Sequence, residues 1–189
     1  MNPIHNVICS SRSWRRRVER ELLPWGLEGV ELGEHALEVG PGFGATTRLL
    51  IKRVPRLDVI EVDTRYCERL EVQFGSRVTV TCGDATSMPY PDDAFSAVVC
   101  FTMLHHIPSP ELQDKVFSEV ARVLAPGGVF AGTDSMGTGT MFKLIHIGDT
   151  LQPVDPGALP SRLEAAGLRE PAVEAADGSF RFRARKPAG

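Results

Sequence analysis

At 189 residues with a formal net charge of −3, the chain is long enough for one domain with a sizeable core. This charge gives no general attraction for nucleic acid or an anionic membrane, and no apolar stretch approaches the ~20 residues that span a bilayer. The four cysteines lack the spacing of a zinc site or a disulfide framework. We therefore expect reduced thiols, no metal, no export signal and a cytoplasmic protein.

The chain divides into an N-terminal segment and an alternating region. Trp14, Val18 and Leu22 are compatible with one amphipathic helix, which Pro24-Trp25-Gly26 would end. From residue 35 onward, short β-branched runs alternate with amphipathic stretches, a pattern typical of a parallel sheet with helices on both faces. We predict an N-terminal helical segment over residues 1–32, the main domain over 33–186 and a tail at 187–189, with disorder from about residue 186.

The main domain contains seven predicted strands. They fall at residues 36–39, 57–62, 78–82, 95–101, 129–133, 172–175 and 180–185. A helix is predicted over 111–124, with Ser109 as its N-cap, and further helices over 141–146 and 159–166, the last ending at Gly167. The final two strands read as a hairpin around Asp177-Gly178. The expected fold is α/β and Rossmann-like, with a mostly parallel seven-stranded sheet and an antiparallel C-terminal hairpin.

Three alternate glycines, Gly40, Gly42 and Gly44, interrupt the passage from the first strand into a helix. Glycine permits close approach of the backbone to a ligand, and a helix N-terminus behind such a loop suits a nucleotide-like ligand. The spacing also satisfies the dinucleotide fingerprint. Glu38 favours the other class of ligand, because its carboxylate would repel a pyrophosphate and attract an ammonium or sulfonium group.

Two further carboxylates should reach the same edge of the sheet. Glu61 ends the second strand, where it could accept hydrogen bonds from ribose hydroxyls, with Asp63 as a weaker choice. Asp84 follows the third strand, beside the small Ala85, and could accept from an adenine amino group. Because ligands bind at the carboxyl ends of the strands in doubly wound sheets, these groups should converge on one crevice.

The chain resembles the class I S-adenosylmethionine-dependent methyltransferases, particularly a small branch akin to quinone-biosynthesis enzymes. The resemblance covers residues 33–133 and rests on segments 38–44, Glu61, 83–85, 93–99, 104–107 and 124–128. It implies that Gly40, Gly42 and Gly44 line the methionine part of the cofactor and that Glu38 holds the loop. It also implies that Glu61 binds ribose and Asp84 the adenine amino group, with Val62 and Ala85 on the ring and Phe101 at its border.

The reaction expected from the resemblance is methyl transfer, leaving S-adenosylhomocysteine. His105 is the candidate general base, although a histidine after a strand more often bonds locally to fix a loop, and His106 is a weaker candidate. The 1–32 segment would cover the active site as a lid. The acceptor pocket should draw on mostly apolar residues: Ile4, Trp14, Met103, Leu104, Met136, Met141, Phe142 and His146. We expect a small, largely apolar acceptor and no nucleic acid; the oligomeric state is left open.

Three other functions stay open at this point. A nicotinamide-dependent oxidoreductase would need room for pyrophosphate beside Glu38. An aminopropyltransferase of related fold would need more acidic residues for a polyamine, and the sequence has no such cluster. A non-catalytic cofactor-binding or partner-dependent module would bind the cofactor and turn over no acceptor.

Overall fold

A computed structural model describes residues 2–137 and 148–189 of the chain. The strands are β1 His35–Val39, β2 Arg56–Glu61, β3 Thr79–Cys82, β4 Phe95–Phe101, β5 Leu124–Ser135, β6 Arg169–Ala176 and β7 Ser179–Arg185. The α-helices are α1 Pro3–Ser10, α2 Arg12–Arg17, α3 Leu23–Gly26, α4 Thr47–Leu50, α5 Thr64–Phe74, α6 Pro110–Val123 and α8 Leu159–Ala165. A π-helical turn, η1 Val18–Leu22, and two 3₁₀ turns, η2 Gly75–Arg77 and η3 Leu104–His106, complete the set.

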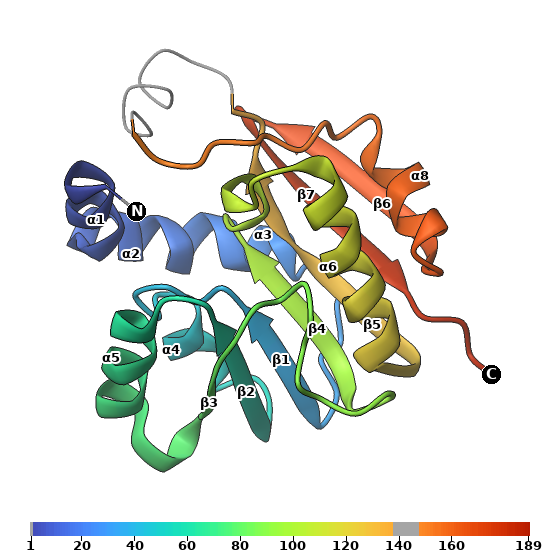
Figure 1. The fold of residues 1–189 in the computed structure, drawn as a ribbon, viewed down its shortest axis with the longest axis horizontal. Coiled ribbons are helices and arrows are strands. Elements are labelled where there is room, and N and C mark those ends of the chain that lie inside the picture. The colour runs from blue at the N-terminus through green and yellow to red at the C-terminus, as the bar shows by residue number, and fades with distance from the viewer. Residues whose placement is uncertain (1, 138–147) are drawn as a thin grey trace.

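The strands form one seven-stranded sheet in the order β3-β2-β1-β4-β5-β7-β6 (Figure 1). The first five strands in the chain pair in parallel, and β7 pairs antiparallel with both β5 and β6. The strand order reverses between β1 and β4, which is the point where open α/β sheets bind ligands. The predicted Rossmann-like fold class is confirmed, and so is the C-terminal hairpin, whose turn residues Asp177 and Gly178 both have positive φ.

Helices cover both faces of the sheet and bury a separate apolar cluster on each. Val116, Phe117 and Val120 of α6 pack with α8 and the hairpin against one face; in Figure 1, α6 crosses in front of the strands. Leu22 and Leu23 of the N-terminal helices pack with α4 and α5 against the other face. The result is a three-layer arrangement that leaves the carboxyl ends of the parallel strands available for a site.

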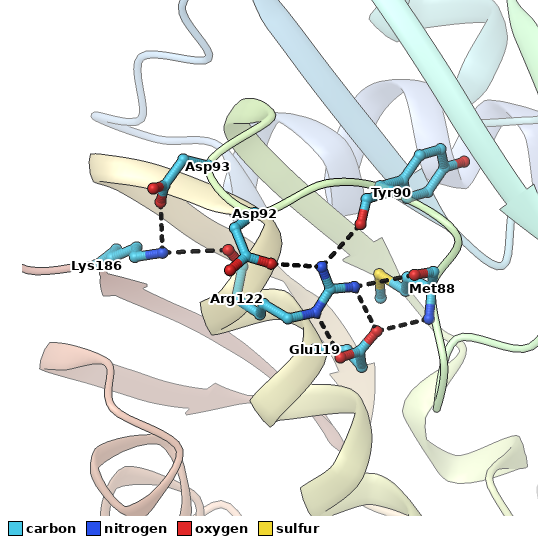
Figure 2. A network of polar contacts seen from close by, with 7 residues as sticks. All are labelled: Met88, Tyr90, Asp92, Asp93, Glu119, Arg122 and Lys186. Atoms are coloured by element: carbon cyan, nitrogen blue, oxygen red, sulfur yellow. Dashed lines mark hydrogen bonds and ion pairs between the residues drawn. The ribbon is translucent and has the colours of Figure 1, made fainter.

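Helix α6 begins as predicted, because the Ser109 hydroxyl accepts a hydrogen bond from the Leu112 N–H at 3.3 Å and Pro110 occupies the first turn. Its end is tied to the loop before β4 (Figure 2). The Arg122 guanidinium donates to Glu119, Asp92 and the carbonyls of Met88 and Tyr90 at 2.7–2.9 Å. This network holds a loop that has no regular secondary structure of its own.

Strand β5 starts five residues earlier than predicted. Residues 125–128 were expected to end α6 and form a turn, yet Leu124 already pairs with Phe95 across a shift in register. At Gly132 the strands approach so closely that a Cβ would lie 1.7 Å from the Cys100 carbonyl oxygen. Gly132 therefore permits close pairing of β5 with β4, and the earlier start of β5 follows from the pairing of Leu124 with Phe95.

The N-terminal segment is helical, as predicted, but differs in detail. A helix α1 precedes the predicted one, and the helix over α2, η1 and α3 continues through Pro24 to Gly26. Just before the proline the helix widens into a π-turn, in which the Leu23 N–H donates to the carbonyl of Val18. Proline lacks an N–H and crowds the preceding turn. The π-turn accommodates the proline within the last turns of the helix, which ends at Gly26, inside the predicted stop Pro24-Trp25-Gly26.

The prediction of reduced cysteines is wrong for one pair. Cys67 of α5 and Cys82 of β3 form a disulfide, with their Cα atoms 5.9 Å apart. Cys82, at the end of β3, is exposed. Spacing along the chain could not indicate this bond, because it depends on α5 packing beside β3.

The predicted disorder from residue 186 is also wrong at its start. The Lys186 N–H donates to the Gly128 carbonyl, and the Gly127 N–H donates to the carbonyls of Lys186 and Pro187.

Within the described residues, no helix combines the length and apolar character needed to cross a membrane. The predicted helix over residues 141–146 lies outside the described part of the chain.

Candidate active site

A cavity of about 630 Å³ opens at the carboxyl ends of the parallel strands. This volume lies in the range that holds small ligands and cofactors. Eight of the predicted site residues line it: Gly40, Gly42, Glu61, Val62, Asp84, Ala85, Phe101 and His105. Glu38 and Gly44 do not. Residues far apart in sequence therefore meet at one edge of the sheet, as the strand order requires.

The three glycines of the loop after β1 serve two different purposes. Gly40, Gly42 and Gly44 all have positive φ, between 53° and 71°. A Cβ on Gly42 would have no atom within 4 Å, because this backbone borders the cavity, whereas a Cβ on Gly44 would lie 2.7 Å from Phe74 in the core. The backbone of Gly42 is thus open to the cavity, while Gly44 packs the loop against α5.

Glu38 anchors this loop from inside the protein. Its carboxylate is 1% exposed and accepts hydrogen bonds from the hydroxyls of Thr46 and Thr47, the latter at 2.6 Å. Burial raises the pKa of Glu38 from 4.5 to about 7, although the two hydroxyls oppose the shift, and the nearby Glu61 carboxylate adds to it. A positive charge placed in the cavity would stabilise the ionised form.

The raised pKa of Glu38 predicts a pH-dependent stability that Glu38→Gln removes. Between pH 4.5 and 7 the folded protein keeps a proton that the unfolded chain has lost, so stability falls as the pH rises through this window and levels off above it. The decline should be on the order of 3 kcal/mol. We expect the free energy of unfolding of Glu38→Gln, measured with urea from pH 5 to 8, to stay level while that of the unchanged protein falls by about this amount.

The matched control is Glu68→Gln, on the exposed side of α5. Its unfolding free energy should follow that of the unchanged protein at every pH. If the free energies of unfolding of Glu38→Gln and of the unchanged protein vary with pH in the same way, the prediction is contradicted.

Glu61 closes the other side of the glycine loop. Its carboxylate accepts from the backbone N–H groups of Gly42 at 3.0 Å, Val62 at 2.9 Å and Asp63 at 3.1 Å, and its residue is 7% exposed. One oxygen, Oε2, has a single N–H donor among these bonds and can accept another. The Gly42 N–H, which would face the pyrophosphate in a dinucleotide site, points to a carboxylate here.

The next strand ends supply a mixed polar and apolar wall. Asp84 is exposed and accepts from the Thr86 N–H at 2.8 Å, which shapes the loop after β3. Val62 is 72% exposed, and Phe101 is buried at the end of β4. Asp63, our second choice for ribose, instead caps α5 and pairs with Arg65 at 2.6 Å; this hydrogen bond lowers the pKa of Asp63.

His105, in η3, also lines the cavity. Its Nδ1 contacts Asp134 Oδ1, and its backbone N–H donates to Asp134 Oδ2 at 3.2 Å. His105 is 3% exposed and Asp134 0%. Sequence reasoning missed Asp134, although a signal was present: it is a carboxylate directly after the apolar run of the fifth strand, in the position that Glu61 occupies on the second.

The N-terminal helices complete the cavity wall. Ile8, Cys9, Trp14, Val18 and Leu22 line it, and burial, followed by the charge of Asp149, raises the pKa of Cys9 to about 11. The Tyr66 hydroxyl donates to Asn6 Oδ1 at 2.6 Å, and the backbone N–H of Asn2 donates to Asp149 at 3.0 Å. The first bond ties α1 to α5, and the second ties the start of the chain to the segment after residue 147.

The predicted acceptor residues are only partly brought together. Trp14 and Met103 line the cavity. Leu104 is fully buried in the core and Met136 packs beside it, so neither contributes to the wall. Met141, Phe142 and His146, and the side chain of Ile4, lie outside the described residues.

Residues 36–128 match the family described as methyltransferase domain. The chain is 29% identical over 159 residues to ribosomal RNA small subunit methyltransferase A of Cupriavidus taiwanensis, covering 74% of this chain and 56% of that protein. It is 36% identical over 109 residues to sterol 24-C-methyltransferase of Yarrowia lipolytica, covering 54% and 28%. The chain therefore spans about half of the first relative's length and less of the second's.

A solved chain in complex with the Haloferax volcanii Trm112 methyltransferase activator shares the fold, with a TM-score of 0.77, 15% identity and 99% coverage of both chains. Residues 36–128, about half of the chain, therefore form a methyltransferase domain, and S-adenosylmethionine is the cofactor of enzymes of this class.

Proposed function

We propose that this protein transfers a methyl group from S-adenosylmethionine to a small, largely apolar acceptor. One observation carries the proposal: the glycine loop, Glu61 and His105, which is paired with Asp134, line a single cavity. A donor site and a group that can accept a proton thus share one volume, which apolar side chains of the N-terminal helices help to enclose.

The donor would occupy the side of the cavity formed by β1, β2 and β3. Gly40 and Gly42 would border its methionine part, and Glu61 would accept from its ribose hydroxyls. The adenine ring would lie between Val62 and Ala85, with its amino group toward Asp84 and Phe101 at the border. The open space beside Gly42 and the Oε2 atom of Glu61, which can accept a further hydrogen bond, support this arrangement.

Glu38 and Gly44 would act on the loop and not on the ligand. The two threonine hydroxyls on Glu38 and the contact of Gly44 with Phe74 support this role. The Glu61 carboxylate, which lines the cavity, favours a cationic donor over the pyrophosphate of a nicotinamide cofactor, because like charges repel strongly in a partly dehydrated site.

Residues 1–32 would act as a lid over the active site of the 33–186 domain. Support comes from the five apolar or small side chains of α1, α2 and η1 in the cavity wall, and from the Asn6–Tyr66 hydrogen bond that holds α1 against α5. An apolar wall of this kind suits a small molecule more than a segment of folded RNA, which would need a basic face.

When bound, S-adenosylmethionine supplies a methyl group on a positively charged sulfur. The protein's part is to align the acceptor with that methyl group and to exclude water. Positioning of this kind can lower a barrier by roughly 7 to 11 kcal/mol. The apolar wall would provide the water-free surroundings.

The test is a thermal unfolding series with S-adenosylhomocysteine, and with NADH as the comparison. At 100 times its Kd, S-adenosylhomocysteine should stabilise the folded state by about 2.7 kcal/mol, whereas NADH should leave the Tm unchanged. An acceptor panel that detects release of S-adenosylhomocysteine then tests the transfer. Stabilisation by NADH alone would refute the proposal, and binding without any turnover would favour a non-catalytic module.

A further inference from the structure

We propose that the Cys67–Cys82 disulfide is a site of reversible reduction that sets the affinity of the protein for its methyl donor. The bonded form, which the structure describes, binds the donor, and the dithiol form binds it more weakly. The inference rests on the proposed methyl transfer and adds the regulation of its donor site. Three features of the fold support it: the position of the bond, the groups that it holds, and the exposure of one partner.

The bond fastens the carboxyl end of an edge strand. β3 has four residues and lies at one edge of the sheet, where β2 is its only neighbouring strand. In the register of that pair, Cys82 lies opposite Glu61. On its other side the disulfide joins Cys82 to Cys67 of α5. An edge strand lacks the second row of hydrogen bonds that holds an inner strand. Without the disulfide, β3 therefore depends on β2 and on packing against α5 alone.

Both ends of the bond reach the donor side of the cavity. Residues 83–86 follow Cys82 directly and line the cavity. The Gly83 N–H donates to the Glu61 carbonyl at 2.9 Å, and Sγ of Cys67 lies 3.4 Å from the same oxygen. A movement of β3 relative to α5 therefore displaces the wall proposed for adenine and, at the same time, the backbone of the residue proposed for ribose.

One partner of the bond is open to a reagent. Cys82 is exposed, whereas Cys67 is 4% exposed. Exposed disulfides are the ones that thiols reduce readily. A thiolate of a dithiol attacks Sγ of Cys82, the S–S bond breaks with its electron pair on Sγ of Cys67, and that sulfur takes up a proton. The second thiol of the reagent then releases Cys82 as a thiol, so two electrons pass to the protein and the reagent becomes a disulfide. A disulfide oxidant reverses these steps.

The other two cysteines make the effect of a reductant easy to assign. Cys9 and Cys100 are free, so the disulfide is the one bond that a dithiol can break. Cys9 lines the cavity, and burial raises its pKa to about 11, which keeps it a poorly reactive thiol at neutral pH. Cys100 is buried in β4 and does not line the cavity, so Cys100→Ala provides a matched control.

Titration calorimetry with S-adenosylhomocysteine compares the oxidised protein with protein reduced by dithiothreitol. We expect the Kd to rise at least about fivefold on reduction, because a wall that is in place for only about a fifth of the time lowers the apparent affinity by that factor. Cys67→Ser/Cys82→Ser should bind as weakly as the reduced protein and should not respond to dithiothreitol. Cys100→Ala should respond as the unchanged protein does.

Two measurements do not depend on bound donor. Alkylation with iodoacetamide in denaturant should label two cysteines of the oxidised protein, and all four after reduction of the folded protein. Hydrogen exchange should then become at least about fivefold faster at residues 79–86 and stay the same in β1 and β4, because only the edge strand loses an attachment.

The inference is overturned if all four cysteines are labelled without reduction, or if the Kd stays the same or falls on reduction. It is also overturned if exchange at residues 79–86 does not change, or if it quickens throughout the sheet, which would mean that reduction unfolds the protein. If the double serine variant does not fold, the two forms of the unchanged protein decide. Absence of binding in both forms refutes the proposed function instead, and hydrogen exchange then decides whether the bond orders the wall.

Discussion

Replacement of Glu61 by glutamine is expected to weaken the binding of S-adenosylhomocysteine by about 100-fold, or roughly 3 kcal/mol. The reason is that two ribose hydroxyls would lose a charged acceptor, and hydrogen bonds to charged groups are the strong ones. Glutamine has one acceptor oxygen in place of two, so it can serve the N–H of Gly42 or the N–H groups of Val62 and Asp63 but not both, and urea unfolding of the variant measures the loss of stability separately from the loss of binding. Isothermal titration calorimetry measures the change directly.

Asp63→Asn is the control for this variant. Asp63 also lines the cavity, two residues further along the chain, but its carboxylate pairs with Arg65. We expect its affinity for S-adenosylhomocysteine to stay within about threefold of the unchanged protein, because an exposed ion pair contributes little. Equal affinities for Glu61→Gln and the unchanged protein would remove Glu61 from the donor site.

Alanine at Gly42 and at Gly44 should separate binding from stability. At Gly42 the added Cβ meets no atom within 4 Å, so the folded protein should lose only about 1 kcal/mol of stability, from the strain of an alanine at positive φ. The same methyl group would stand where the donor approaches the backbone, and affinity should fall at least about tenfold. At Gly44 the Cβ overlaps Phe74 and Leu70, and the loss of stability should reach about 3 kcal/mol.

Urea unfolding of both variants gives their stability, and titration calorimetry gives their affinity for S-adenosylhomocysteine. The outcome that contradicts the assignment is the reverse pattern, in which Gly42→Ala is the less stable variant and binds S-adenosylhomocysteine normally.

The elements that sequence reasoning predicted best are those whose signals are local. Strand β4 occupies Phe95–Phe101, as predicted, because its apolar run is bounded by polar residues before it and by a turn after it. Helix α6 begins at Pro110 because the capping serine and the proline are adjacent in sequence. The C-terminal hairpin follows from Asp177-Gly178, a dipeptide whose positive φ angles match the twist of the strands.

The features that were missed depend on which elements become neighbours. The Cys67–Cys82 disulfide requires α5 to pack beside β3, and the early start of β5 requires its pairing with β4. The π-turn before Pro24 depends on a helix that continues because its apolar face is buried against the sheet. None of these contacts leaves a periodic signal along the chain.

The sequence by itself determined the class of fold and most of the loop and strand-end residues that line the cavity, because hydrophobic periodicity and a glycine loop act over a few residues. Only the tertiary structure decided which groups face the cavity: it placed Glu38 and Gly44 outside the wall and paired His105 with Asp134, 29 residues away. The physical reason is that the burial, charge pairing and orientation of a side chain depend on which strands and helices pack around it. Residues far apart in the chain make those contacts.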